Sequence, residues 1–473
     1  MVCFVEKTNY TQEASVSINT IFQNVNHPKS VLNQLKTSDG LPFKDILSAH
    51  AIAKNIESCN FRNRIFSPDV TMWGFLSQVL SDDQSCQAAV AHIIAHFANQ
   101  GKVIPSPNTA AYSKARSRLP ETLISNLAKE CADQLEENAS PNWFWRKRHI
   151  KLIDGSTLFM PDTCENQAVY PQMKNQKPGL GFPIARIVAI LSYATGAILD
   201  LAMGGCFGKG AGEHTLLRQL MHVFKPGDIV LGDSYYGSYF LIATLMRLKV
   251  DVVFPLHNGR HHDFRKGQKL GRKDHIVEWK KPPKPEWMSI KEYNQFADSF
   301  IIREVEIQMA RNGFRSKSRI IVTTFLDSQC VNNNDLKNIY SYRWCVEVDL
   351  MSIKETMRMG ILRGKTPSMV RKEVWAHVLA YNLVRKVMAQ AALVHNKQPR
   401  TLSFKFTLQL LEAFRNLGIF SEKNATYHVL LEAIAYRTVG NRPGRHEPRK
   451  LKRRPKNYPL LRKPRHHYHK LAI

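Results

Sequence analysis

The sequence predicts an α/β protein whose mixed β-sheet core is interrupted by a mainly β insertion and flanked by helical N-terminal and C-terminal regions. Apolar residues recur every three or four positions before about residue 147 and again after Val374, as in amphipathic helices. Between these regions, short runs rich in Val, Ile and Leu end at Gly, Asp and Ser, as buried strands do. A composition of 44% hydrophobic and 10% aromatic residues is typical of a globular protein.

The formal net charge of the chain is +28. A surplus of this size creates a strong positive field, and the usual polyanion that meets it is nucleic acid. An anionic membrane is the alternative partner, but no basic amphipathic helix with a bulky apolar face stands out. The most apolar stretch, 183–205, contains Arg186 and Asp200 and breaks at Thr195-Gly196, so two paired strands explain it better than a membrane span. We therefore expect a nucleic-acid partner and no membrane.

The eight cysteines are scattered, and no two form a Cys-x2-Cys pair. Structural zinc and a disulfide framework are therefore not expected, whereas buried thiols in a reducing cytosol are. The N-terminus lacks a basic segment followed by an apolar one, so it does not resemble a signal peptide. The glycine-rich stretch 208–213 lacks the Gly-Lys-Ser/Thr ending of a phosphate-binding loop, so no nucleotide cofactor is expected. Its Glu213 is expected to begin a helix, with an outer acidic group near a site as the alternative.

Residues 1–147 are predicted to form a helical DNA-binding region. Within it, the stretch 106–120 predicts one short basic helix that carries Lys114, Arg116 and Arg118. These side chains suit phosphate contacts, and a solvated helix face is the alternative interpretation.

Strands and helices then alternate through the first part of the core, 148–256. The predicted elements are, in order, strands at 148–160, 184–193 and 197–203, a helix at 212–224, a strand at 228–233, a helix at 239–250 and a strand at 251–256. Three strands, a helix, a strand, a helix and a strand is the order of an RNase H-like core.

The rest of the chain divides by composition. Residues 257–317 are basic, loop-rich and alternating in part, which predicts a mainly β insertion. The second part of the core, 318–395, begins with a strand, and a helical C-terminal region follows at 396–440. Residues 441–473 carry twelve Lys or Arg against one Glu, with five prolines, which predicts a flexible basic tail.

Asp154 and Asp233 lie where two predicted core strands lose their apolar character. In open α/β sheets, ligands bind near strand ends, and two carboxylates brought together there require a cation between them. Oxygen-only ligands favour Mg²⁺ or Mn²⁺, and paired divalent ions suit in-line phosphoryl transfer. Ordinary turn chemistry is the alternative for either Asp taken alone.

The predicted helix over 339–357 carries one polar stripe. With about 100° per residue, four side chains fall within an arc of about 60°; they are Tyr340, Arg343, Glu347 and Lys354. Asp349 lies on nearly the opposite side. A solvated Arg343–Glu347 pair is the alternative interpretation. It leaves unexplained why the remaining circumference is so apolar, with Trp344, Val346, Val348, Leu350, Met351 and Ile353. A mostly buried helix with one charged stripe favours a functional site.

The spacing Tyr340-x2-Arg343-x3-Glu347-x6-Lys354 resembles, position for position, the signature of DDE transposases of the insertion sequence 4 family. The stretches IDGST and LGDSYYG, which contain Asp154 and Asp233, resemble the first and second catalytic Asp motifs of that family. The resemblance covers about 149–390. Members often have Arg after the second Asp, where this chain has Ser234, so a phosphate contact expected there is in doubt.

The resemblance implies a bacterial, cytoplasmic and nucleoid-associated enzyme whose partner is double-stranded DNA, and which acts as a homodimer on the terminal inverted repeats of its element. It implies that Asp154, Asp233 and Glu347 chelate two Mg²⁺ ions, which Mn²⁺ may replace. Hydrolysis would free a 3′-OH, a hairpin would form and reopen, and the 3′-OH would join target DNA. The DNA-end contacts implied are Tyr340, Arg343 and Lys354. For an aromatic that stacks on a displaced base, the candidates in the insertion are Trp279 and Trp287, with packing as the alternative role.

Two other functions remain open on the residues alone. One is a Mg²⁺-dependent RNase H-like DNA nuclease without strand transfer. The other is a domesticated, non-catalytic DNA-binding protein, against which the intact acidic triad argues.

Overall fold

The computed structural model describes residues 65–208, 210–309, 317–415, 425–439, 462, 463 and 467. The chain forms two compact units. The catalytic unit comprises the described residues within 141–378 and 439–473, and the helical unit comprises the described residues within 1–140 and 379–438.

A nine-stranded mixed sheet organises the catalytic unit, with the strand order β3-β2-β1-β4-β5-β9-β8-β7-β6. Strands β1, β4 and β5 are parallel, and every other neighbouring pair is antiparallel. The strands are β1 (Ile150–Phe159), β2 (Ile184–Ser192), β3 (Ile198–Gly205), β4 (Ile229–Leu231), β5 (Asp251–Pro255), β6 (Gln268–Gly271), β7 (Asp274–Lys280), β8 (Ser299–Met309) and β9 (Lys317–Thr323). The order β3-β2-β1-β4-β5, with its mixed pairing, confirms the predicted RNase H-like core.

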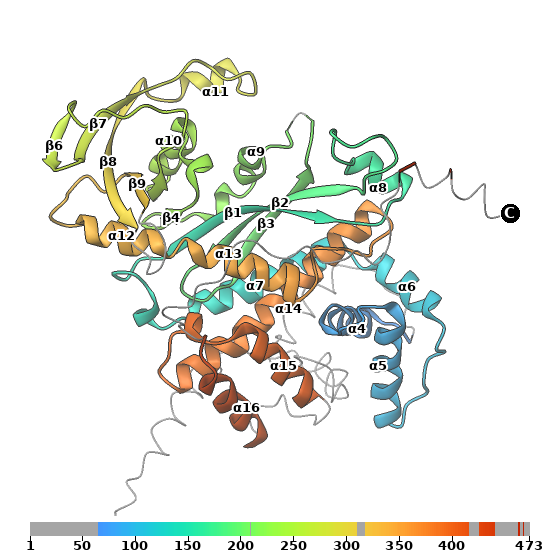
Figure 1. Ribbon diagram of the computed structural model, residues 1–473. Helices are drawn as coiled ribbons and strands as arrows, with labels where there is room; N and C mark the ends of the chain where they lie inside the picture. Colours follow the sequence, from blue (N-terminus) through green and yellow to red (C-terminus); the bar gives the residue numbers. More distant parts are fainter. Residues whose placement is uncertain are drawn as a thin grey trace, which may run out of the picture. The chain divides into compact units, whose positions relative to one another are not determined.

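Helices cover both faces of this core sheet (Figure 1). On one face, apolar side chains of α9 and α10 pack on Ile153, Val188 and Val252. On the other face α13 packs against β1, and α12 lies beside β5 and β8. Because neighbouring strand residues point to opposite faces, Asp154 lies on the α13 face. The helices and helical turns of this unit are η1 (Pro141–Trp143), α8 (Cys164–Val169), α9 (Glu213–Arg218), η2 (Met221–Val223), η3 (Ser234–Tyr236), α10 (Tyr239–Arg247), α11 (Ile290–Asn294), α12 (Asn333–Ser341), α13 (Trp344–Met351) and the π-helical turn η4 (Ser352–Thr356).

The insertion continues the same sheet rather than forming a separate layer. Strand β8 pairs with β9 along its length, and β7 and β6 extend the sheet outward. A fully buried Arg303 on β8 joins the insertion to α12, since its guanidinium donates to both Asp274 carboxylate oxygens at 2.8 and 2.6 Å. The same guanidinium donates to the Val331 carbonyl at 2.6 Å and the Asn333 side chain at 2.7 Å.

The helical unit contains the described part of the N-terminal region and the C-terminal helices. Its elements are α4 (Pro68–Leu80), α5 (Cys86–Asn99), α6 (Thr109–Arg118), α7 (Glu121–Glu137), η5 (Pro399–Thr401), α15 (Phe404–Arg415) and α16 (Ala425–Tyr436). Helix α14 (Pro367–Val394) begins in the catalytic unit and ends in the helical one. Within the helical unit, Asn382 of α14 donates to the Ala128 carbonyl of α7 at 3.0 Å. Throughout the described ranges, the helices are too short or too polar to cross a membrane.

Two expectations about local structure were wrong. Asp154 does not end its strand, because β1 continues to Phe159 by pairing with β2. The helix over 339–357 is not a uniform α-helix, because Tyr342 and Arg343, between α12 and α13, keep helical dihedral angles but lie in tighter turns with i→i+3 hydrogen bonds, and a π-helical turn follows α13. Three of the apolar residues expected to be buried on α13 are exposed, namely Trp344, Val348 and Met351.

Candidate active site

Asp154 and Asp233 lie at the same level of two neighbouring parallel strands. Leu152 of β1 pairs with Leu231 of β4, and each Asp follows two residues later. A backbone N–H orients each carboxylate at 2.8 Å, from Gly155 to Asp154 and from Tyr235 to Asp233. The parallel register therefore brings together two carboxylates that are 79 positions apart in the sequence.

A third acidic side chain contributes to the charge at this point. Burial, followed by the charges of Asp233 and Glu213, raises the pKa of Asp154 to about 6. Glu213 begins α9 and lies against Gly155, where an added Cβ would meet its carboxyl carbon at 2.6 Å. The Tyr236 hydroxyl donates to Glu213 at 3.2 Å, and burial and these carboxylates raise the pKa of that hydroxyl. Arg186 lies 3.8 Å from the Glu213 carboxylate and offsets part of this negative charge.

The junction between α12 and α13 places the Arg343 guanidinium within the electrostatic reach of Asp154. Tyr342, at this junction, stacks on Tyr193 with ring centroids 4.2 Å apart and planes 17° from parallel. Arg343 follows, and its Nη2 donates to Glu347 Oε1 at 2.7 Å. Burial opposes the charge of Arg343, but the bond to Glu347 and the nearby Asp154 raise its pKa. The Arg343–Glu347 pair expected from the spacing is thus present, and it lies at the site rather than on a distant surface.

Lys354 reaches β1 from the π-helical turn η4. Its Nζ donates to the Ser156 hydroxyl at 2.8 Å. Ser156 lies two residues beyond Asp154, so both side chains point to the same face of the strand. The Phe159 N–H donates to the Gly360 carbonyl at 3.0 Å, which ties the end of β1 to the segment after η4. Lys354 and Arg343 therefore both lie along the face of β1 that carries Asp154.

Tyr340 is buried near the end of α12, with 4% of its surface exposed. Burial raises the pKa of its hydroxyl, Arg343 and Arg319 act against that rise, and Asp233 adds to it. The hydroxyl therefore lies within the field of these three charged groups. Of the predicted stripe, Lys354 contacts β1, Arg343 interacts with Asp154, and Tyr340 interacts with Asp233, whereas the partner of Glu347 is Arg343.

The donor chemistry of this site fits a hard divalent cation. The two aspartates supply oxygen ligands at one level, and their mutual repulsion would be relieved by such an ion. Within the described ranges, however, no three His, Cys, Asp or Glu side chains converge closely enough to hold a metal as they stand. Glu347 is directed to Arg343, so it would have to exchange that partner to become a third ligand.

The three basic residues of α6 differ in their surroundings. Lys114 and Arg118 are exposed and, being four positions apart, share one helix face. Arg116 is half-buried, donates to the Gln78 side chain at 2.8 Å and lies over the Phe75 ring at 4.9 Å. Arg116 therefore contacts α4 within the helical unit, whereas the exposed side chains of Lys114 and Arg118 could bind a phosphate.

The two candidate tryptophans also differ. Trp279 is 3% exposed, donates its indole N–H to Glu304 at 2.7 Å and is covered by Arg260 at 3.7 Å. It presents no face on which a base could stack. Trp287 is half-exposed, with Arg218 over its ring at 4.0 Å. Of the two, only Trp287 offers an accessible aromatic surface.

Sequence reasoning missed the contributions of Ser156 and Arg319. Ser156 belongs to the quoted IDGST stretch, yet nothing local indicated that it would accept a hydrogen bond from Lys354, 198 positions away. Arg319 is exposed near the start of β9 and follows the polar residues Lys317 and Ser318, so no local signal in the sequence singled it out.

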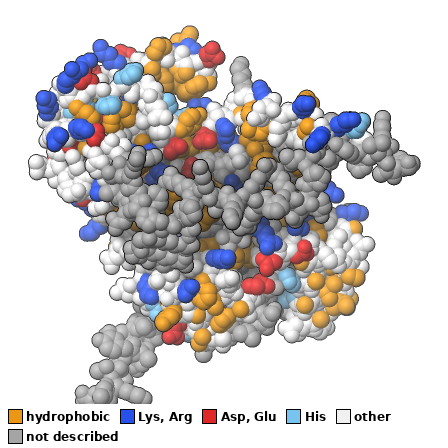
Figure 2. Space-filling view, viewed as in Figure 1, with side chains coloured by type: hydrophobic (Ala, Val, Ile, Leu, Met, Phe, Trp, Pro, Cys, Tyr) orange, Lys and Arg blue, Asp and Glu red, His pale blue; other side chains and the backbone are white. Residues whose placement is uncertain are grey.

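Basic side chains also gather over the outer strands of the insertion, as Figure 2 shows. The exposed members there are Arg265, Lys266, Lys269, Arg272, Lys273 and Lys280. The predicted basic tail, 441–473, lies outside the described residues except for three of them.

Known proteins with a similar sequence or structure are transposases. Residues 145–383 match the family described as "Transposase DDE domain". The chain is 25% identical over 413 residues to "Transposase InsG for insertion sequence element IS4" of Escherichia coli (strain K12), which covers 85% of this chain and 89% of that protein. A piggyBac transposase synaptic complex with hairpin DNA, solved by cryo-EM, aligns with 92% of this chain and 87% of its own at 9% identity and a TM-score of 0.42, too low to bear on the fold. The chain is an enzyme that belongs to the DDE transposases of the insertion sequence 4 family.

Proposed function

We propose that this transposase binds the terminal inverted repeats of its own element as a homodimer, cleaves the DNA ends through a hairpin intermediate and joins the freed 3′-OH ends to target DNA. Enzymes of this family generally use divalent metal ions, and the proposed cofactor is Mg²⁺, with Mn²⁺ as a substitute. The observation that carries the proposal is the placement of Asp154 and Asp233 at one level of neighbouring parallel strands. Arg343 and Lys354 lie along the same face of β1.

Ions bound by Asp154 and Asp233, with Glu347 as a further ligand, would activate an attacking oxygen and stabilise a leaving one. The chain itself supplies the groups that hold the DNA end. The guanidinium of Arg343 suits bidentate binding of a phosphate, the ammonium of Lys354 acts as a point charge, and the hydroxyl of Tyr340 can donate a hydrogen bond.

The Arg343–Glu347 bond suggests how DNA binding and site assembly are linked. The Nη2 atom of Arg343 donates to Glu347 Oε1 at 2.7 Å. A backbone phosphate that binds Arg343 would compete for this guanidinium and release the Glu347 carboxylate toward the two aspartates. DNA should then increase the affinity of the protein for a divalent ion, and the ion should increase the affinity for DNA by the same factor.

The first test uses Asp233→Asn and Glu347→Gln. Each removes one charge from the proposed metal ligands without a large change of volume. Both variants should lose Mg²⁺-dependent end cleavage while they retain binding to a duplex made from the DNA that flanks the coding region. Retained cleavage in both variants would contradict the ligand assignment.

A matched control is Glu355→Gln, which makes the same change on an exposed residue of η4. This variant should cleave as the wild type does. Metal binding can also be measured without an activity assay. A ligand that binds only the folded state stabilises that state, so Mg²⁺ should raise the unfolding temperature. That rise should disappear in Asp233→Asn and persist in Glu355→Gln.

Strand transfer distinguishes the proposed function from a nuclease. When the protein is given a pre-cut end with a free 3′-OH and a plasmid target, joined products support a transposase, and cleavage without joining supports the nuclease. The absence of any Mg²⁺- or Mn²⁺-dependent cleavage would favour a non-catalytic DNA-binding protein.

The exposed face of Trp287 is the proposed support for a base displaced during hairpin formation. Trp287→Ala should reduce the hairpin product while it leaves the first nick intact, and Trp287→Phe should restore part of the product because a ring remains. Denaturing gels resolve the two species. Equal loss of nick and hairpin would indicate that Trp287 acts on folding or DNA binding instead.

A further inference from the structure

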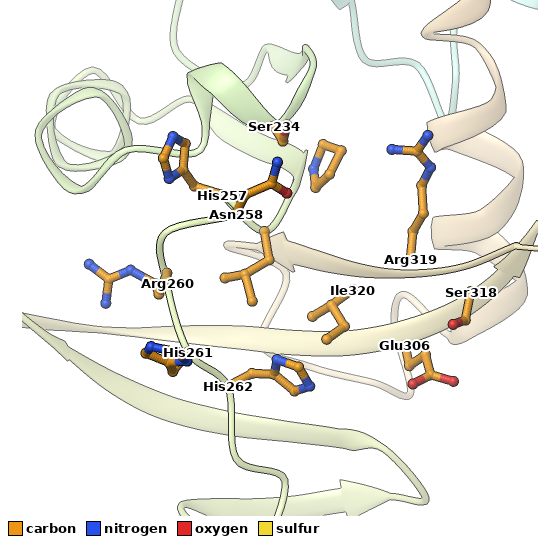
Figure 3. Close-up of a pocket in the computed structure, with 12 residues that line it drawn as sticks. Ser234, His257, Asn258, Arg260, His261, His262, Glu306, Ser318, Arg319 and Ile320 are labelled. Atoms are coloured by element: carbon orange, nitrogen blue, oxygen red, sulfur yellow. The ribbon is translucent and has the colours of Figure 1, made fainter.

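A pocket of about 630 Å³ opens beside the second catalytic aspartate. It is formed by the segment that leaves β5, the first residues of β9 and the residue directly after Asp233. Figure 3 shows Ser234, His257 and Asn258 on one side of it, with the Arg319 side chain extending from β9 toward the same region. Its size exceeds that of a lone phosphate group and suits a nucleotide unit.

The sheet register places this pocket one strand away from the catalytic carboxylates. Ile229 of β4 pairs with Asp251 of β5, so the level of Asp233 corresponds to Pro255, which lines the pocket. Neighbouring strands are separated by about 4.8 Å. A DNA strand whose scissile phosphate lies at Asp154 and Asp233 can therefore reach the pocket with an adjacent nucleotide.

The charges of the pocket are unbalanced in favour of an anion. The Arg319 side chain forms no hydrogen bond or ion pair with any residue that the structure describes. Glu306, an acidic residue of the lining, is already neutralised by Lys273 at 2.8 Å. A second guanidinium, that of Arg260, also lines the pocket and is fixed by stacking on Trp279.

We propose that Arg319 and the pocket around it bind a backbone phosphate that flanks the scissile phosphate of the DNA end. This inference rests on the proposed function, and it assigns a substrate contact to a strand outside the signature helix. Arg319 also acts electrostatically on Tyr340, a second reason to place its guanidinium at the DNA end. The Ser234 side chain is small and lines the same pocket, so the guanidinium of Arg319 has room there.

Arg319→Ala tests the contact directly. This variant should bind the flanking-DNA duplex about 10-fold more weakly, and the slope of its log affinity against log salt should decrease by about one, as expected for one lost phosphate contact. The matched control is Arg265→Ala, which removes the same charge from an exposed side chain already paired with Asp263. Arg265→Ala should change the slope less. Equal affinity and slope for Arg319→Ala and wild type would overturn the proposal.

Neutral methylphosphonate linkages identify the phosphate. Placed one at a time beside the cleavage point, one such linkage should weaken binding of the wild type and have no further effect on Arg319→Ala, because both changes remove the same contact. Additive losses at every position would contradict a shared contact.

Ser234→Arg in the Arg319→Ala background supplies a guanidinium to the same pocket from the opposite side. It should recover most of the lost affinity and salt dependence, whereas Ser234→Gln should not. If Ser234→Arg recovers neither affinity nor salt dependence, and the methylphosphonate effects are additive, Arg319 does not bind the DNA phosphate. The proposed function is judged separately, because it fails if the wild type itself shows no divalent-metal-dependent cleavage of this duplex or cleaves it without joining the 3′-OH end to a target.

Discussion

Lys354 illustrates how one side chain is positioned at the site by a partner far away in the sequence. Its ammonium is held at 2.8 Å by Ser156, on the same face of β1 as Asp154. A serine hydroxyl does not neutralise a cation, so the charge remains available to a phosphate. Ser156 thus orients Lys354 without competing with the DNA for it.

Lys354→Ala should reduce end cleavage on the order of 100-fold, since it removes one donor proposed to stabilise the charge that develops on the phosphate. Lys354→Arg should retain part of the activity, and Ser156→Ala should cost less than Lys354→Ala because the ammonium itself remains. Single-turnover cleavage rates measure all three. A larger loss in Ser156→Ala than in Lys354→Ala would show that the serine has a role of its own.

At the residue scale, the sequence predicted which side chains to examine but not all of their contacts. The spacing of Tyr340, Arg343, Glu347 and Lys354 depends on a repeating local geometry and is readable without a structure. The approach of Glu213 to Gly155 and of Arg319 to Tyr340 depends on strand register across the sheet. No local pattern encodes such register. The catalytic roles themselves remain predictions for the experiments above.

At the scale of elements, the irregular helix over 339–357 was the clearest departure from prediction. Periodicity assumes a uniform α-helix, and neither Gly nor Pro marks the junction after Ser341. Tyr342, at this irregular turn, stacks on Tyr193, a contact between distant positions that no single stretch of sequence contains. Helix α13 packs against β1, and its residues Trp344, Val348 and Met351 are exposed, although their types suggested burial.

The buried Arg303 connects two elements, the insertion and α12. Removing one partner of a buried ion pair leaves an uncompensated charge, so Arg303→Ala and Asp274→Ala should each destabilise the protein by about 3–5 kcal/mol. The double variant should lose less than the sum of the two, since neither charge is then left alone. Urea unfolding of the four proteins measures this cycle. Additive losses would mean that the two side chains do not interact.

At the scale of the whole molecule, stability should depend on pH through the buried His377 of α14. Burial lowers its pKa to about 4, against the hydrogen bond to the Glu373 carbonyl at 2.9 Å. The unfolded chain takes up this proton near pH 6.5 and the folded chain does not. Stability is therefore present above about pH 6.5 and should fall by up to about 3 kcal/mol as the pH decreases toward 4.

The comparison for this prediction is His377→Gln, which should show a flatter stability profile between those two pH values. The surface variant His428→Gln should follow the wild type. Urea unfolding across the pH range measures all three. Parallel profiles for His377→Gln and wild type would show that other groups determine the acid sensitivity.

The net charge of +28 is the other property of the whole molecule, and twelve of the Lys and Arg residues lie in 441–473. Deleting this segment should weaken DNA binding and flatten its dependence on salt, because fewer counterions are released. The loss should be similar for flanking and unrelated duplexes, since phosphate contacts carry no sequence information. An unchanged salt slope would show that the segment does not meet DNA.

The point where the insertion leaves and rejoins the sheet has a consequence for how this enzyme can vary. The Leu256 N–H donates to the Ile320 carbonyl at 2.8 Å, so the chain departs and returns at adjacent positions. Segments with such neighbouring ends can be lengthened, shortened or exchanged without changing the order of the strands around them. If the segment were removed, however, β9 would become an open edge, and exposed edges invite association with other chains. The length and side chains of the insertion can therefore vary. Any replacement must still supply a strand that pairs with β9 as β8 does.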